Sequence, residues 1–159
     1  REWLAEQEQP LARDPSDSIA AVSVAEQRIA EVLNEAKRRA PAATVVAVDY
    51  LTILGPDLAD YPDMPLAPEQ VPPLRALGAA LAGATASAAR SCGALLVRAS
   101  AASQQHGVGS PEPWVGGPEG GDPLRGGPIP FHPTLAGMTA VADLVVSLLQ
   151  SKQRGAEAR

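Results

Sequence analysis

Two short apolar runs, each preceded by a stretch of helical pattern, constrain the fold of this chain more than any other feature. Residues 44–48 (TVVAV) and 94–98 (ALLVR) are almost continuously aliphatic. Such runs are typical of strands buried on both faces in a parallel sheet. Helical spacing precedes them over 18–39 and 74–91, and it follows the second over 133–152. This alternation predicts an α/β protein with right-handed crossovers.

Prolines, glycines and one serine set the expected limits of these elements. Ser18 is the expected cap of the first helix, Pro41 stops it, and Pro133 suits the first turn of the last helix. We expect no regular structure over 55–73, where proline recurs, and a loop in the glycine-rich segment 107–127. Two strands alone make a poor sheet. The pattern therefore predicts the C-terminal part of a flavodoxin-like, three-layer αβα domain with a parallel sheet.

The expected organisation has three parts. Residues 1–18 form an irregular N-terminal arm, residues 19–152 belong to the α/β domain, and residues 153–159 form a polar tail. The sequence opens without a methionine and without a signal peptide, so we expect that residue 1 is not the biological start.

Composition excludes several classes of function. The net charge is −5, and no basic stripe is available to neutralise phosphates, so we expect no nucleic-acid partner. Cys92 is the only cysteine, which rules out a disulfide within the chain and a cysteine-based zinc site. It favours a reducing, cytoplasmic location. No apolar run is long enough for a transmembrane segment.

The chain has two histidines, His106 and His132, and both follow the second predicted strand. In open α/β sheets, sites form beyond the carboxyl ends of the strands. His132 also adjoins the start of a helix, which would fix the direction of its side chain. Taken by position alone, His132 could equally be an exposed capping residue, and His106 a solvated loop residue. Neither has a second ligand at helical spacing, so we expect no metal.

Residues 131–138 (FHPTLAGM) resemble the last signature block of the SGNH/GDSL serine hydrolases, H-P-x-x-x-G, which leads into a terminal helix. The segment from 37–41 into Asp49-Tyr50 is similar to the part of the family that follows its Asn block. The loop from 106 to 115 resembles that of actinobacterial lipase-like members. The resemblance covers about residues 19–150 and implies that this stretch is the C-terminal portion of an SGNH hydrolase domain.

In the family, the histidine that matches His132 is the general base for a serine nucleophile, the proline opens the helix, and the glycine that matches Gly137 lets the helix pack closely. The family often places Asp three residues before the histidine, where this chain has Ile129. Either a backbone carbonyl near Ile129 or the more distant acid Asp122 would then orient the ring. The serine and most of the oxyanion hole would come from blocks on an upstream N-terminal half, which the resemblance makes a required partner.

The resemblance implies a hydrolase of acyl esters that works through an acyl-serine intermediate and without a cofactor. Trp114 and Phe131, with His106, would contact the substrate; the alternative is that the two aromatic side chains only anchor the glycine-rich loop. Two other functions stay open. One is an intracellular acyltransferase that moves a fatty acyl group to a sugar or glycolipid hydroxyl. The other is a non-catalytic α/β binding module in which His132 is a capping residue.

Overall fold

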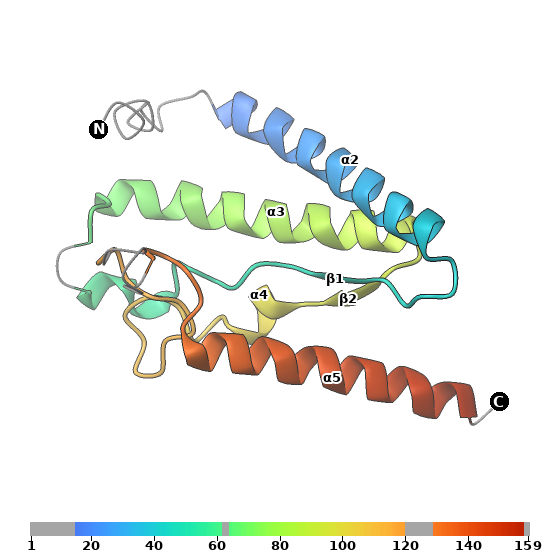
Figure 1. The fold of residues 1–159 in the computed structure, drawn as a ribbon. Helices are drawn as coiled ribbons and strands as arrows, with labels where there is room; N and C mark the ends of the chain where they lie inside the picture. Colours follow the sequence, from blue (N-terminus) through green and yellow to red (C-terminus); the bar gives the residue numbers. More distant parts are fainter. Residues whose placement is uncertain (1–14, 62–63, 120–128, 158–159) are drawn as a thin grey trace.

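The structure is a computed structural model that describes residues 15–61, 64–119 and 129–157. Along the chain it contains α2 (Pro15–Arg39), β1 (Val46–Val48), the 3₁₀ turns η2 (Pro56–Asp60) and η3 (Pro68–Gln70), α3 (Val71–Ser91), β2 (Leu95–Val97), α4 (Ala99–Ala102) and α5 (Leu135–Glu157). The two strands are parallel neighbours, with α3 on one side of them and α5 on the other (Figure 1). The fold is therefore mixed α and β with a small parallel sheet.

The strands are shorter than the apolar runs that predicted them, and they are only partly buried. Val46 pairs with Leu95 and Val48 with Val97. Ala47 and Val97 are buried, as expected for an interior sheet, whereas Val48 keeps 42% of its surface exposed. Within the described residues β1 pairs only with β2, and α5 packs against β2. The end of β1 is therefore less covered than the end of β2.

One core, the helix-side core, lies where α2 and α3 meet the sheet. Its buried members are mostly small, and they let the two helices approach closely. They are Leu33, Ala47, Ala88, Ala89 and Cys92. The side chains of α2 that reach this core are Ile29, Ala30 and Leu33, whereas Val32 is exposed. Lys37 closes the far end by donating to the carbonyls of Cys92 (2.6 Å) and Gly93 (3.3 Å) beyond α3.

A second core, the loop-side core, lies at the carboxyl ends of the strands. Its buried members come from the loops rather than from long helices, and they are Leu51, Leu58, Ala99, Val108 and Val115. Val108 and Val115 are almost fully buried. The glycine-rich segment is thus anchored at Val108 and Val115, although it has no helix or strand of its own over its described part.

Several element limits differ from those we predicted. The first helix begins at Pro15 rather than Ser18, so the last residues of the expected arm 1–18 are helical. Two 3₁₀ turns interrupt the expected loop 55–73, and α3 begins at Val71. Proline explains the early starts of both α2 and α3, because its missing N–H costs nothing in the first turn of a helix. The short helix α4 was not predicted at all.

The last helix also differs at both ends. It begins at Leu135, because Pro133 forms an isolated antiparallel bridge with Val115 and Thr134 accepts the N–H of Gly137 at 3.1 Å as a cap. It continues to Glu157, so the start of the expected polar tail 153–159 is helical. Exposed polar residues are compatible with a helix end when one face of the same helix is packed.

Candidate functional site

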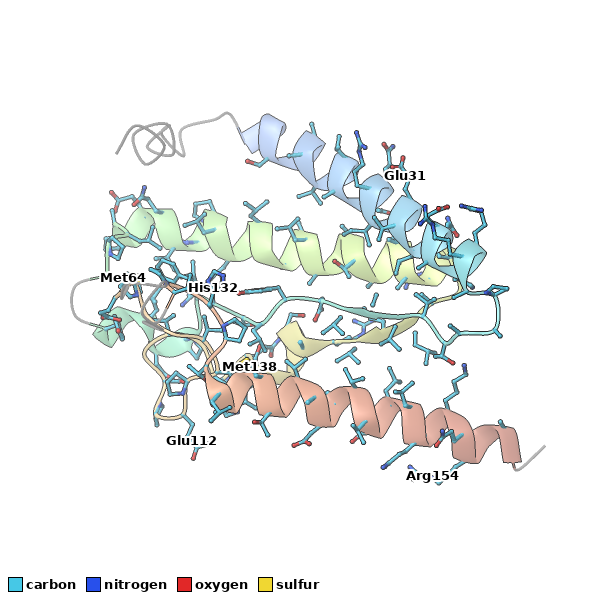
Figure 2. The ribbon with its side chains drawn as sticks, in the orientation of Figure 1. Glu31, Met64, Glu112, His132, Met138 and Arg154 are labelled. Carbon is cyan, nitrogen blue, oxygen red and sulfur yellow. The ribbon has the colours of Figure 1, made fainter. Side chains whose placement is uncertain are left out.

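His132 lies on a short ribbon formed by two loop segments. Val115 and Pro133 make an antiparallel bridge, flanked by a bond from the Thr134 N–H to the Trp114 carbonyl (2.9 Å) and one from the Gly116 N–H to the His132 carbonyl (2.9 Å). Val115 is fully buried in the loop-side core and anchors the ribbon. His132 is exposed and lies toward the end of the molecule where α5 begins, away from Arg154 (Figure 2).

The His132 ring is oriented by a backbone carbonyl. Its Nδ1 lies 2.9 Å from the Pro130 carbonyl oxygen. A carbonyl can only accept, so Nδ1 carries the proton and Nε2 keeps a lone pair. That tautomer is the one a general base requires.

We predicted an orienting backbone carbonyl near Ile129, and the ring lies against the carbonyl of the next residue, Pro130. The Ile129 carbonyl accepts the backbone N–H of His132 (3.3 Å), while the ring binds the next carbonyl along the chain, that of Pro130. The reason is local: Phe131 has φ 58, which reverses the chain tightly and brings the Pro130 carbonyl under the ring. A positive φ on a residue with a side chain costs about 1–2 kcal/mol, which the surrounding contacts must offset. Asp122, the alternative orienting acid, lies outside the described residues.

Phe131 is held from both sides. Its N–H donates to the Gly117 carbonyl (3.2 Å), and its carbonyl accepts the hydroxyl of Tyr50 (3.2 Å). Tyr50 is the second residue after β1, so this bond places His132 beside the carboxyl end of that strand. Partial burial raises the pKa of Tyr50 above its ordinary value.

His106 and Trp114 form a stacked pair, with ring centroids 4.3 Å apart and planes 3° from parallel. The His106 Nδ1 lies 2.9 Å from the Glu112 carbonyl, and the backbone N–H of Trp114 donates to the His106 carbonyl (2.8 Å). Trp114 and Phe131 both pack against the loop-side core. These contacts agree with the anchoring alternative for the two aromatic side chains.

A cavity of about 310 Å³ lies beside the histidine ribbon. Its lining is mainly apolar and comes from the end of β1 and the first turns of α5. The lining residues are Val48, Asp49, Tyr50, Leu51, Pro133, Met138 and Val141. Trp114, Phe131 and His106 are not among them. A volume near 300 Å³ is at the lower end for small-molecule sites.

Asp49 is a buried carboxylate that our sequence analysis left without a role. Its Oδ1 accepts the N–H of Ser100 (2.9 Å) and its Oδ2 accepts the Ser100 hydroxyl (2.6 Å). It therefore ties the end of β1 to the start of α4. The sequence signal that could have indicated a role for Asp49 is its position, as a polar residue directly after a buried strand. In the described part of the chain, Asp49 is bonded to Ser100 and not to His132.

Gly137 has the packing role that the resemblance implies. A Cβ built on it would lie 2.1 Å from the Trp114 carbonyl oxygen, so only glycine lets α5 start this close to the ribbon. The motif H-P-x-x-x-G thus contains both the oriented histidine and the glycine that lets α5 pack closely against the ribbon.

Over residues 15–61, 64–119 and 129–157, the hydrogen bonds of His132 run to Ile129, Pro130 and Gly116, and none runs to a serine. The same residues contain no group of three or more potential metal ligands. No helix among them has the length and apolar character needed to cross a membrane.

Comparison with models of known protein families and with curated protein sequences finds no match to this chain.

Proposed function

We propose that this chain is the C-terminal part of an SGNH-type, flavodoxin-like ester hydrolase and that His132 is its general base. One observation carries the proposal: the Pro130 carbonyl fixes the His132 ring with Nδ1 as donor and Nε2 as a free lone pair. The motif residues around it support the same function, because Gly137 allows the close packing that this motif implies.

In the proposed reaction, Nε2 takes the proton of a serine hydroxyl as that oxygen attacks the ester carbonyl. The imidazolium then returns the proton to the leaving alcohol, and an acyl-serine remains. Water repeats the sequence and releases the acid. The Pro130 carbonyl orients the ring in every step, but it offers the imidazolium a dipole rather than the full charge of a carboxylate.

The serine belongs to an upstream segment in this proposal. Support comes from the surface beside the site, where Val48, Met138 and Leu135 are exposed at 42%, 54% and 77%. Strands of parallel sheets are usually covered on both faces, and exposed apolar side chains gathered in one place mark contact surfaces. The strand β1 has a neighbour on only one edge within the described residues. We keep the cytoplasmic location as part of the proposal, on the evidence of the lone cysteine.

The test compares two histidine variants of the full-length protein on p-nitrophenyl esters of increasing acyl length. His132→Gln should lower kcat/KM by about 10²- to 10⁴-fold, since that is the usual contribution of a general base. His106→Gln is the matched control, because it changes the other histidine, whose ring is stacked on Trp114; we expect a far smaller loss. Full activity in His132→Gln would sink the proposal, and so would equal losses in both variants.

A further inference from the structure

We propose that Tyr50 is a positioning residue that holds His132 in its base-competent tautomer from the end of β1, through the Phe131 carbonyl. The inference rests on the proposed function for its catalytic meaning, but the positioning itself can be measured without activity.

Every backbone polar group around the histidine has a partner. The Pro130 carbonyl accepts the His132 ring, the Phe131 N–H donates to Gly117, the His132 N–H donates to Ile129, and the His132 carbonyl accepts from Gly116. The remaining group, the Phe131 carbonyl, accepts the Tyr50 hydroxyl at 3.2 Å. Apart from the His132 ring itself, Tyr50 is the one of these partners that acts through a side chain.

The bond from Tyr50 acts on the peptide plane that joins Phe131 to His132. That plane carries the Phe131 carbonyl at one end and the His132 N–H at the other, so Tyr50 and Ile129 hold it from opposite sides. Phe131 would otherwise avoid φ 58. When the Tyr50 bond is lost, the Phe131 carbonyl is free to move and φ of Phe131 can relax. Because this torsion joins the Pro130 carbonyl to the Phe131 carbonyl and His132, its relaxation carries the His132 ring away from the Pro130 carbonyl.

The backbone of Tyr50 is anchored through the residue before it, while Tyr50 itself keeps 53% of its surface exposed. The preceding residue, Asp49, is buried and bound to both the N–H and the hydroxyl of Ser100. Tyr50 also lines the cavity beside the ribbon. Its raised pKa keeps the hydroxyl protonated, and therefore a donor, throughout the range in which histidine titrates. The end of β1 thus helps to fix the position of His132 through the bond from Tyr50 to the Phe131 carbonyl.

The experiment uses ¹⁵N NMR of the histidine rings in the full-length protein. The two neutral tautomers have different nitrogen shifts, and the chain's two histidines act as probe and internal reference. Tyr50→Phe removes one oxygen and keeps the ring. We expect His132 to change from mainly Nδ1–H to a mixture of tautomers, while His106, bonded to the Glu112 carbonyl, stays unchanged.

Tyr61→Phe is the matched control, because the hydroxyl of Tyr61 lies against Gly117 of the same ribbon but donates to Glu119 rather than to the Phe131 carbonyl. It should leave the His132 shifts where they are. With activity as a second readout, Tyr50→Phe should lower kcat by about 10- to 100-fold with little change in KM, as expected when a reacting group is displaced rather than removed. If Tyr50→Phe does not fold, raising the pH of the wild type through the ionisation of Tyr50 removes the same donor.

An unchanged His132 tautomer in a folded Tyr50→Phe protein would overturn the inference. The two proposals fail in different ways. If His132→Gln keeps its activity but Tyr50→Phe shifts the tautomer, the positioning stands and the hydrolase function falls. If His132→Gln is inactive and the tautomer does not move, only the role of Tyr50 is wrong.

Discussion

At the residue scale, the chemistry of this site depends on backbone carbonyls more than on acids. The His132 ring is oriented by the Pro130 carbonyl. The buried carboxylate of Asp49 accepts two hydrogen bonds from Ser100 instead. A carbonyl fixes direction but adds little charge, so the site favours a precise ring position over strong stabilisation of the imidazolium. A precise ring position requires a fixed backbone, and several hydrogen bonds hold the backbone of residues 130–132.

The ionisation of Tyr50 gives a prediction at the same scale. Burial favours the neutral phenol in the folded protein, so its pKa lies above the ordinary 10.0. The resulting stability is complete below the unfolded pKa and is lost as the pH rises through the higher folded pKa. Titration of tyrosinate absorbance should show a late component that Tyr50→Phe removes. If the component that Tyr50→Phe removes titrates at or below the ordinary value, the prediction is wrong.

The residues of the site were predictable to different degrees. His132 and Gly137 could be found because their motif has a fixed spacing before a helical pattern. The ring's partner could not, since the choice between the carbonyls of Ile129 and Pro130 depends on the positive φ of Phe131, and phenylalanine gives no sign of that conformation. Tyr50 was visible only as a residue that leaves a strand; its bond joins positions 81 residues apart.

At the scale of elements, periodicity located the three long helices and both strands, while local chemistry at their ends was harder to anticipate. Apolar spacing persists over many residues and survives small errors. A helix end depends on a single proline or cap, as at Pro15, Pro72 and Thr134. The short helix α4 has too few residues for a period, and its position is set by Asp49 from another part of the chain.

The close start of α5 gives a prediction about stability. Gly137→Ala should lower the free energy of unfolding by about 1–3 kcal/mol, because the new methyl would meet the Trp114 carbonyl, which belongs to the fixed ribbon. Gly83→Ala, in the exposed middle of α3 with nothing within 4 Å of the added carbon, is the control and should gain about 0.5–1 kcal/mol. Urea unfolding of the two variants measures both values. Equal effects would show that the contact at Trp114 carries no strain.

At the scale of the whole molecule, the described residues form two cores and leave apolar side chains exposed at the end of β1 and the start of α5. The helix-side core joins α2 and α3 to the sheet, and the loop-side core holds the loops that carry the histidine. The α/β character and the parallel strand pair are as the sequence predicted. The three-layer arrangement and its further strands remain a prediction, because the sequence pattern of one part of a sheet does not specify the strands beside it.

The open surface formed by Val48, Leu135 and Met138 borders the cavity next to His132. In our account, this surface meets the segment that carries the nucleophile, so the site is shared between two parts of one enzyme. In that account, the serine would reach His132 beside the cavity, whose lining includes Pro133 but not His132.

Fluorophosphonate labelling tests this central claim most directly. The full-length protein, with every polypeptide that co-purifies, is treated with the probe and read by intact mass and peptide mapping. The account predicts one adduct on a serine outside residues 1–159, lost in His132→Gln and retained in His106→Gln. An adduct on a serine within residues 1–159, or labelling that His132→Gln leaves unchanged, would contradict it.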